Sequence, residues 1–396
     1  MSENSQNYPT EEVKFGGESE ADLNRTVIVP GLASGAADNT TNITVGGGIP
    51  DRKRKKEIED LVGGVDINPY ISLDLDVSPE LESSLETVGA RYAMLTEFAE
   101  GGTAKISIAR DRNLRRLVAV KSLRMDAENI KDLLTSFVTE AKVTAQLDHP
   151  GIIPIYGLAR DEQNGIHLVM KLVNGRTLRE YLKNITLNYR IRGVDAFDET
   201  VELRKRLEIF LRVCDTLVYA HHRNVIHRDL KPENIMIGKY MEVFVMDWGL
   251  AKILSEGGDN FPENHKISGT LRYFPPEVLR GDPLDLRSDI FTLGLILQEV
   301  VTLRYAFDGH DEKEIVDRVR KGQIEPVVHL FGRKIDGKLR AIIRKATAYD
   351  LKERYQTVED LAEDLRRYMG GLSISAGTGN FVDKFLRFVF ERILKL

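Results

Sequence analysis

The chain has 396 residues, of which 42% are hydrophobic and 30% are charged, which is the balance of a soluble globular protein with one two-lobed domain or two ordinary ones. Its net charge of −5 excludes the strongly basic composition of a nucleic-acid-binding protein. The single cysteine, Cys214, excludes a disulfide framework and a cysteine-based zinc site. The sequence has no run of about 18 uncharged apolar residues and no signal peptide at its start, so it predicts a cytoplasmic protein.

Residues 1–90 differ in composition from the rest of the chain. They contain 17 acidic and 7 basic side chains, and their only aromatic residues are Tyr8, Phe15 and Tyr70. No apolar period persists there, so the segment cannot bury enough surface to offset its conformational entropy. We expect a mostly disordered acidic arm, in which the basic run at 51–56 is a solvated charge cluster or a patch that binds a polyanion.

Dense apolar periodicity begins at Arg91. Strand-like runs at 105–109 and 117–122 flank a charged turn, and apolar residues with mainly helical spacing follow at 129–147. The other predicted elements are strands at 152–158 and 166–173, a long helix at 202–222, and helices near 288–303, 311–321, 336–348 and 357–369. Residues 184–200 have no usable period. Strands first and helices afterwards predict an α+β fold.

The most informative string is HRDLKPEN at residues 227–234, between a long predicted helix and an apolar run. Asp247, Trp248 and Gly249 follow a second apolar run. Upstream, VAVK at 118–121 closes a strand that comes after a glycine-bearing turn, and downstream lie a Gly-Thr pair at 269–270 and a Pro-Pro-Glu triplet at 275–277. Each motif alone is weak, but their order and spacing together are specific.

Together these motifs resemble the bacterial eukaryotic-like (Hanks-type) serine/threonine protein kinases over about residues 91–370. The resemblance implies a two-lobed kinase fold, with a strand-rich N-lobe at 91–170, a hinge at 171–173 and a helical C-lobe at 174–370. It also implies an enzyme that transfers the γ-phosphoryl group of ATP to serine or threonine hydroxyls of protein substrates. Such transfer depends on positioning and charge neutralisation more than on covalent help from the protein.

The resemblance assigns a role to each matching residue. Asp229 accepts or orients the proton of the substrate hydroxyl, and Lys231 is directed at the transferring phosphate. Asn234 and Asp247 match the two ligands of Mg²⁺, a site that Mn²⁺ could also occupy. Lys121 matches the lysine that holds the α and β phosphates, and Glu140 matches its partner on the following helix.

The resemblance also outlines an ATP pocket, in which Met170 guards the back and the hinge backbone bonds to adenine. The expected nucleotide-binding positions, besides Lys121 and Glu140, are Ala99, Gly101, Gly102, Ala104, Ile106, Ala119, Met170, Lys171, Val173 and Met236. The glycine-rich loop is irregular, because alanines replace its first and third glycines and only Gly101 keeps the middle position. A stiffer loop and lower nucleotide affinity are expected.

Other positions bear on structure and regulation. Trp248 replaces the usual phenylalanine and should pack under the helix that carries Glu140, and Asp289 resembles the residue that braces the catalytic loop. Arg354 and Glu277 match a buried ion pair whose disruption costs about 3–5 kcal/mol. In the activation segment at 247–277, acidic residues either partly replace an activating phosphate or form a solvated charge run.

The competing function is a pseudokinase-like scaffold that holds ATP weakly, which the irregular glycine loop favours and the complete catalytic set opposes. A small-molecule kinase is disfavoured by the Gly-Thr and Pro-Pro-Glu elements. We expect autophosphorylation within residues 1–90, with Thr26 a candidate that could recruit a phosphopeptide-binding partner.

The C-terminal region, 371–396, reads as a glycine-containing linker followed by an amphipathic helix. Its last residues, 381–396, combine a broad phenylalanine-rich apolar face with four basic and two acidic side chains. The segment is too short and too charged to span a bilayer. Two alternatives remain: a helix that docks on the C-lobe or pairs two chains, or one that lies at an anionic membrane surface.

Overall fold

The computed structural model describes residues 86–100, 104–123, 130–162, 165–196, 198–253 and 271–377. Several expectations therefore fall outside the described residues. They are the acidic arm up to residue 85, Gly101 and Gly102, residues 254–270 of the activation segment, and the segment 381–396.

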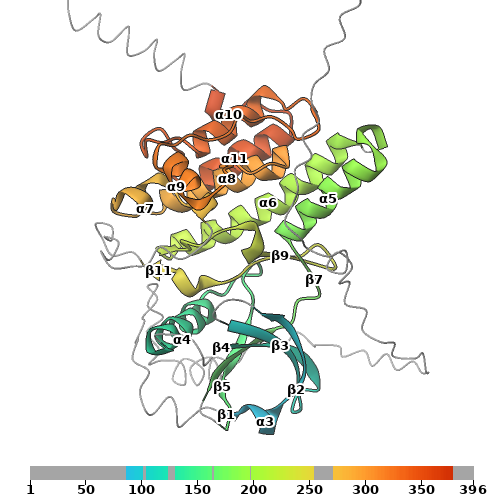
Figure 1. Cartoon of the computed structure of the whole chain (residues 1–396), viewed down its shortest axis with the longest axis vertical. Helices are drawn as coiled ribbons and strands as arrows, with labels where there is room; N and C mark the ends of the chain where they lie inside the picture. Colours follow the sequence, from blue (N-terminus) through green and yellow to red (C-terminus); the bar gives the residue numbers. More distant parts are fainter. Residues whose placement is uncertain are drawn as a thin grey trace, which may run out of the picture. The chain divides into compact units, whose positions relative to one another are not determined.

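A six-stranded sheet forms the N-terminal part of the fold, in the order β1-β5-β6-β4-β3-β2 (Figure 1). All neighbouring strands are antiparallel except β1 and β5. The strands are β1 Glu86–Thr87, β2 Tyr92–Glu100, β3 Ala104–Asp111, β4 Arg116–Leu123, β5 Ile155–Arg160 and β6 Ile166–Lys171. The two strands predicted on either side of the charged turn are thus confirmed as β3 and β4.

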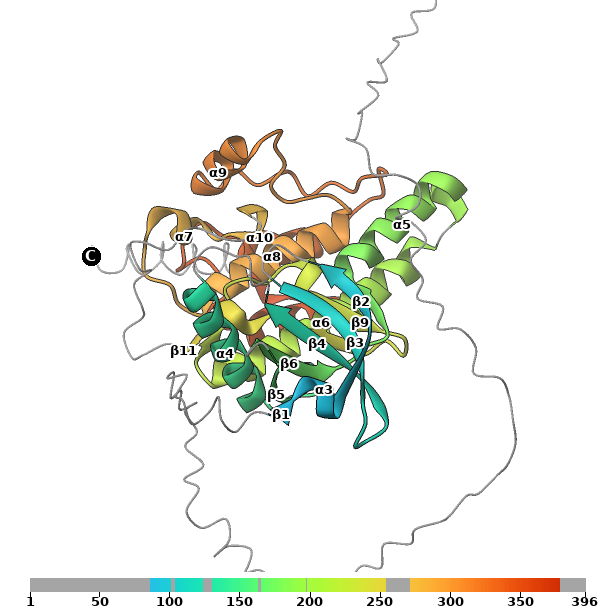
Figure 2. The same cartoon turned by 60° about the horizontal axis from the view of Figure 1, so that its bottom comes forward.

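One helix, α4 (Ile130–Gln146), lies beside this sheet in both views of the chain (Figures 1 and 2). Its buried side chains Phe137, Val138 and Ala141 pack with Ile166 and Leu168 of β6. This agrees with the helix predicted at 129–147. The contact positions the polar residue Glu140, which lies between these apolar residues on the same helix.

Two elements at the start of the N-terminal part, the helix α3 and the strand β2, were not anticipated. The described residues include five positions before the expected domain start, 86–90, and a short helix α3 (Val88–Arg91) that begins among them buries Val88. The strand β2 has register shifts between Met94 and Thr96 and between Glu97 and Ala99. These irregularities interrupt the alternation of apolar and polar residues, so the strand has no clear sequence signature.

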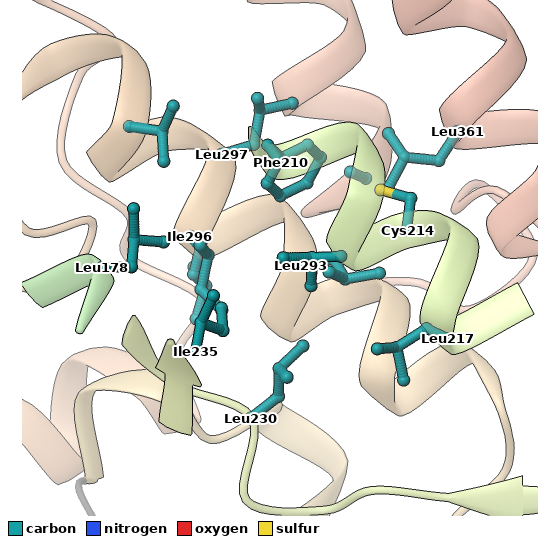
Figure 3. Close-up of a cluster of buried hydrophobic side chains, with 14 of the residues drawn as sticks. Leu178, Phe210, Cys214, Leu217, Leu230, Ile235, Leu293, Ile296, Leu297 and Leu361 are labelled. Atoms are coloured by element: carbon teal, nitrogen blue, oxygen red, sulfur yellow. The ribbon is translucent and has the colours of Figure 1, made fainter. Parts of the chain in front are cut away.

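The C-terminal part is helical. Its helices are α5 Leu178–Arg192, α6 Glu199–His222, α7 Pro276–Arg280, α8 Arg287–Thr302, α9 Glu312–Arg320, α10 Gly337–Ala346 and α11 Val358–Met369. The five long helices predicted from apolar spacing beyond residue 201 are confirmed as α6 and α8–α11. Figure 3 shows the centre of their core, where Phe210 and Cys214 of α6 lie near Leu293 and Leu297 of α8.

The unassigned stretch 184–200 is mostly the second half of α5. This helix begins at a capping box formed by Thr177 and Glu180 and ends at Gly193, whose φ of 81° suits glycine. Ile185 and Tyr189 are buried, but Leu187 and Ile191 are 39% and 71% exposed. Apolar residues on both faces of the helix obscure the amphipathic period, which explains why the sequence pattern was uninformative.

Short strands position the loops between the two parts. Strands β7 (Gly175–Thr177), β9 (Ile235–Gly238) and β10 (Val243–Val245) form one small sheet, and β8 (Val225–Ile226) pairs with β11 (Lys252–Ile253). The HRDLKPEN string therefore lies between β8 and β9. Within the part of the chain that the structure describes, no helix combines the length and apolar character needed to cross a bilayer.

Candidate active site

The loop that follows β8 is held from beneath by Asp289, the third residue of α8. The Asp289 carboxylate accepts hydrogen bonds from the backbone N–H groups of His227 at 2.9 Å and Arg228 at 3.1 Å, and it contacts His221 Nε2 at 2.8 Å. The expected bracing of the loop is therefore confirmed. The carboxylate is fully buried, and although burial alone raises its pKa, the His221 contact and the backbone donors lower it below the usual value.

Two polar residues of this loop converge on the carboxylate of a third, Asp229. Lys231 Nζ lies 2.7 Å from Asp229 Oδ2, and Asn234 Nδ2 donates to the backbone oxygen of Asp229 at 2.8 Å and to Oδ2 at 3.1 Å. The short helical turn Pro232–Asn234 brings Asn234 back toward Asp229. The Asp229 side chain is 12% exposed, so it is fixed in orientation and still accessible.

A second cluster joins the N-terminal sheet to the segment after β10. Lys121 Nζ lies 2.8 Å from both carboxylate oxygens of Glu140 and 3.0 Å from Asp247 Oδ1. The expected pair between β4 and α4 is thus present in the structure. The contact between Lys121 and Asp247, 126 residues apart, was not anticipated.

In this cluster the ammonium group of Lys121 contacts the carboxylates of both Glu140 and Asp247. Burial lowers the pKa of Lys121, but the charges of Glu140 and Asp247 outweigh it and raise the pKa above its usual value. For Asp247, burial raises the pKa, but the charge and hydrogen bond of Lys121, together with the nearby cationic groups of the catalytic loop, outweigh burial and lower the pKa. Burial and the Asp247 charge raise the pKa of Glu140. The cluster has one unit of excess negative charge when all three groups are ionised, which suits a cationic ligand.

The backbone at Asp247 is strained, with φ at 63° in the left-handed region, and Arg228 has φ at 69°. Trp248 follows Asp247 and is fully buried, with its ring 4.5 Å from that of His227 and its Nε1 donating to the Val245 carbonyl. The short helical turn Trp248–Leu250 contacts α4. Trp248 therefore helps to fix the turn that presents Asp247, and this turn contacts the helix that carries Glu140, against which the sequence predicts Trp248 to pack.

The strands bring several expected nucleotide-binding positions together. Cross-strand pairs align Ala99 with Ile106, Ile106 with Lys121, and Ala119 with Met170. Ala104 opens β3, and Met236 lies on β9 opposite Phe244.

The first residue of the expected hinge, Lys171, is also the last residue of β6. It pairs with Val118, and its N–H donates to the Pro154 carbonyl at 2.9 Å. The connection to β7 is the stretch 172–174, which includes Val173. No local pattern indicated the hydrogen bond of Lys171, because it depends on the tertiary position of the segment before β5.

Sequence reasoning did not anticipate the burial of Arg179. Arg179 lies in the first turn of α5. It contacts Glu233 of the catalytic loop, Tyr273 of the turn Leu271–Tyr273, and Glu299 of α8. These partners are 54 to 120 residues away in the chain. An arginine near a helix start carries no signal that it will be buried.

A model of the "Protein kinase domain" family matches residues 92–365 of the sequence. The chain belongs to the protein kinase family. It is 32% identical over 307 residues to serine/threonine-protein kinase PknD of Protochlamydia amoebophila, with 71% of this chain and 30% of the relative covered. It is 33% identical over 285 residues to PknB of Mycobacterium tuberculosis, with 71% and 43% covered. The resemblance to bacterial serine/threonine kinases is confirmed.

A third relative, the probable serine/threonine-protein kinase SCO3848 of Streptomyces coelicolor, is 31% identical over 293 residues, with 73% of this chain and 41% of the relative covered. The chain thus spans less than half the length of the curated relatives it matches. The similarity concerns the kinase domain, which corresponds to the described sheet and helices.

Proposed function

We propose that the chain is an ATP-dependent protein kinase that transfers the γ-phosphoryl group to serine and threonine hydroxyls of protein substrates. One observation carries the proposal: Asp229, with Lys231 and Asn234 on its carboxylate, is present in the same fold as the linked cluster of Lys121, Glu140 and Asp247. Phosphoryl transfer needs both a group that receives the proton and charges that hold the phosphates.

In this proposal Asp229 accepts the proton of the attacking hydroxyl. Its Oδ2 is the atom held by Lys231 and Asn234, so Oδ1 is left to face the substrate. Lys231 carries a positive charge next to the reacting hydroxyl and compensates charge that develops on the transferring group. The serine/threonine class rests on Lys231, on Thr270 and on the named relatives.

Asn234 and Asp247 would hold a magnesium ion. Among the described residues, the side-chain hydrogen bonds of Asn234 come from its Nδ2, which leaves its Oδ1 acceptor for a cation. Asp247 contacts Lys121 through Oδ1 and its side chain is 43% exposed. Amide and carboxylate oxygens are the ligands that Mg²⁺ prefers, and the ion, when bound, neutralises phosphate charge. No described cluster of three His, Cys, Asp or Glu side chains offers another metal site.

On the nucleotide side, Lys121 would contact the α and β phosphates while Glu140 keeps its ammonium in place. The adenine pocket would be lined by Ile106, Ala119, Met170 and Met236, with Val173 offering backbone groups. Ala104 stands where a third glycine is usual and starts β3, which supports a stiffer phosphate-binding loop.

The test compares the wild-type chain with Asp229→Asn in Mg²⁺, labelled ATP and a generic protein substrate. We expect transfer to fall by about 10²- to 10⁴-fold in the variant, since a general base contributes that much. Asp317, a half-exposed carboxylate on α9, provides the matched control, because Asp317→Asn makes the same chemical change outside the cluster around Asp229. Equal labelling by the wild type and Asp229→Asn contradicts the proposal. Bound ATP without any transfer supports the scaffold function instead.

Two parts of the proposal concern segments outside the described residues. Autophosphorylation would fall within residues 1–90, with Thr26 as one acceptor, and the modified arm would recruit a phosphopeptide-binding partner. The segment 381–396 would hold a cytoplasmic enzyme at an anionic membrane surface. Composition alone supports both, since the arm is rich in hydroxyl residues and the segment is basic and apolar.

A further inference from the structure

A buried arginine links α5 to three other elements of the C-terminal part. The Arg179 side chain is 10% exposed, and its Nε donates to Glu233 Oε1 at 2.7 Å. Its Nη1 donates to Glu299 Oε1, and its Nη2 donates to the hydroxyl of Tyr273 and, at 3.4 Å, to Glu299 Oε2. One guanidinium therefore ties together the catalytic loop, α8 and the turn Leu271–Tyr273.

The environment keeps this guanidinium charged and in one orientation. Burial lowers the pKa of Arg179, but the charge of Glu299 and the other partners outweigh burial and raise the pKa above its usual value. The guanidinium carbon also lies 4.9 Å from the ring centre of Tyr305. Arginine fits such a site because its planar group donates to several acceptors at once and stacks on aromatic rings.

The two carboxylates differ in their access to solvent. The Glu299 side chain is 6% exposed, whereas that of Glu233 is 41% exposed. Glu233 immediately precedes Asn234, which donates to Asp229. A polypeptide whose hydroxyl reaches Asp229 therefore passes close to Glu233. Among the described residues, Glu233 Oε2 is a buried oxygen without a hydrogen-bond partner, so Arg179 uses only one of the two acceptors of this carboxylate.

A carboxylate next in sequence to the residues that hold Asp229 would normally attract a basic side chain of a substrate, because charge-assisted hydrogen bonds to a partly buried carboxylate are strong. Here the protein's own cation already contacts both Glu233 and Glu299. Its charge offsets one of the two carboxylates, and its contacts take up Glu233 Oε1 and both oxygens of Glu299.

We infer that Arg179 is a specificity-determining residue: it occupies, from within the protein, the acidic pair Glu233 and Glu299, so that this kinase does not select substrates with a basic residue near the phosphorylated hydroxyl. The inference rests on the proposed kinase function. Removal of this internal arginine should therefore create a preference for basic substrates that the wild-type enzyme lacks.

The experiment uses the full chain and a set of nine-residue peptides with a central threonine among alanines. The parent peptide contains no arginine. Each of the other peptides carries one arginine in place of one alanine, and together they cover every alanine position. The ratio of kcat/KM for the arginine peptide to that for the parent is measured for the wild type, Arg179→Met and Arg179→Met/Glu233→Gln. Arg190→Met is the control, because Arg190 is an exposed arginine on the same helix.

We expect ratios near one at every position for the wild type and for Arg190→Met. In Arg179→Met the ratio rises at least about tenfold at one or two positions, equivalent to about 1.4 kcal/mol. The increase in this ratio should disappear in Arg179→Met/Glu233→Gln, because the carboxylate of Glu233 is then lost. A merely structural role would lower the activity toward all peptides equally, so a folded Arg179→Met with no positional preference overturns the inference.

The wild type alone supplies a second test, should Arg179→Met fail to fold. If the wild type already prefers arginine tenfold at some position and Glu233→Gln removes that preference, Glu233 is open to substrates and the inference is wrong. Absence of transfer to every peptide, and to a generic protein substrate, would instead count against the proposed kinase function.

Discussion

At the residue scale, the site depends on carboxylates whose orientation is fixed by the donors around them. Asp229, Asp247 and Asp289 each accept from at least one cation or backbone N–H within 3.1 Å. Of the three, Asp289 is the most deeply buried. Its role is to position the backbone of the catalytic loop, and the energy of its hydrogen bonds sets the stability of that loop.

This arrangement makes part of the stability depend on pH. The folded-state pKa of Asp289 is lower than in the unfolded chain, so its contribution is present above about pH 4 and is lost as the pH falls through the folded-state value. We expect Asp289→Asn to lower the free energy of unfolding by about 3 kcal/mol near neutral pH. The amide has no charge, and it puts a donor in place of one of the two oxygens that accept hydrogen bonds.

Urea unfolding of both proteins at about pH 6 and about pH 3, which lies below the ordinary pKa of an aspartate, measures this contribution. The difference in the free energy of unfolding between wild type and Asp289→Asn should shrink at the lower pH, since the wild type alone loses an ionised carboxylate there. A difference that stays constant or grows on acidification would show that Asp289 is not ionised in the folded state.

At the element scale, the packing of α8 against α10 requires a residue without a side chain. A Cβ at Gly294, in the middle of α8, would lie 2.6 Å from Thr347 Cγ2 and 2.8 Å from Ala346 Cβ. Both neighbours are buried at the end of α10. The close approach of the two helices places α8, and with it Asp289 and Glu299, against the rest of the core.

The prediction is that Gly294→Ala destabilises the domain although alanine favours helix formation. The gain in helix propensity is about 1 kcal/mol, whereas overpacking costs about 1–3 kcal/mol, so we expect a net loss of about 1–2 kcal/mol. Gly337 is the control: it is the first residue of α10, and a Cβ there would meet no atom within 4 Å.

Thermal or urea unfolding distinguishes the two substitutions. Gly337→Ala should leave the free energy of unfolding unchanged within about 0.5 kcal/mol or increase it slightly. Equal effects of the two alanines would mean that α8 and α10 can separate without cost, contrary to their packing.

At the scale of the whole domain, the contact of Lys121 with both Glu140 and Asp247 joins the N-terminal sheet to the C-terminal part. The backbone contributes a second link, since Val245 N–H donates to the Gly151 carbonyl at 2.8 Å. A ligand that binds both sides of this junction stabilises the folded state by mass action.

We therefore expect a non-hydrolysable ATP analogue with Mg²⁺ to raise the melting temperature. At about 100 times its Kd the stabilisation is about 2.7 kcal/mol, which corresponds to about 5–10 °C for a domain of this size. Asp229→Asn should keep the increase, because Asp229 acts on the hydroxyl substrate. Asp247→Asn, or removal of Mg²⁺ by a chelator, should reduce it. An unchanged melting temperature in the wild type would contradict the nucleotide site.

The sequence by itself determined the fold class, the positions of the confirmed long helices and the catalytic motifs. These features rest on local periodicity, or on motifs whose members lie within a few residues of one another, as Asp229, Lys231 and Asn234 do. The pair Lys121–Glu140 and the pair Glu277–Arg354 were also predicted, from the order of motifs. The second pair is fully buried, as expected.

Only the tertiary structure decided the features that depend on distant partners. The second half of α5 is a helix because Ile185 and Tyr189 find buried positions in the core, although exposed apolar residues hide its period. The N–H of Lys171 is committed to Pro154, and Arg179 is buried because two carboxylates and a tyrosine meet around it. Burial of a charged group is decided by which oppositely charged groups the whole fold brings near it, and no stretch of sequence around Arg179 contains that information.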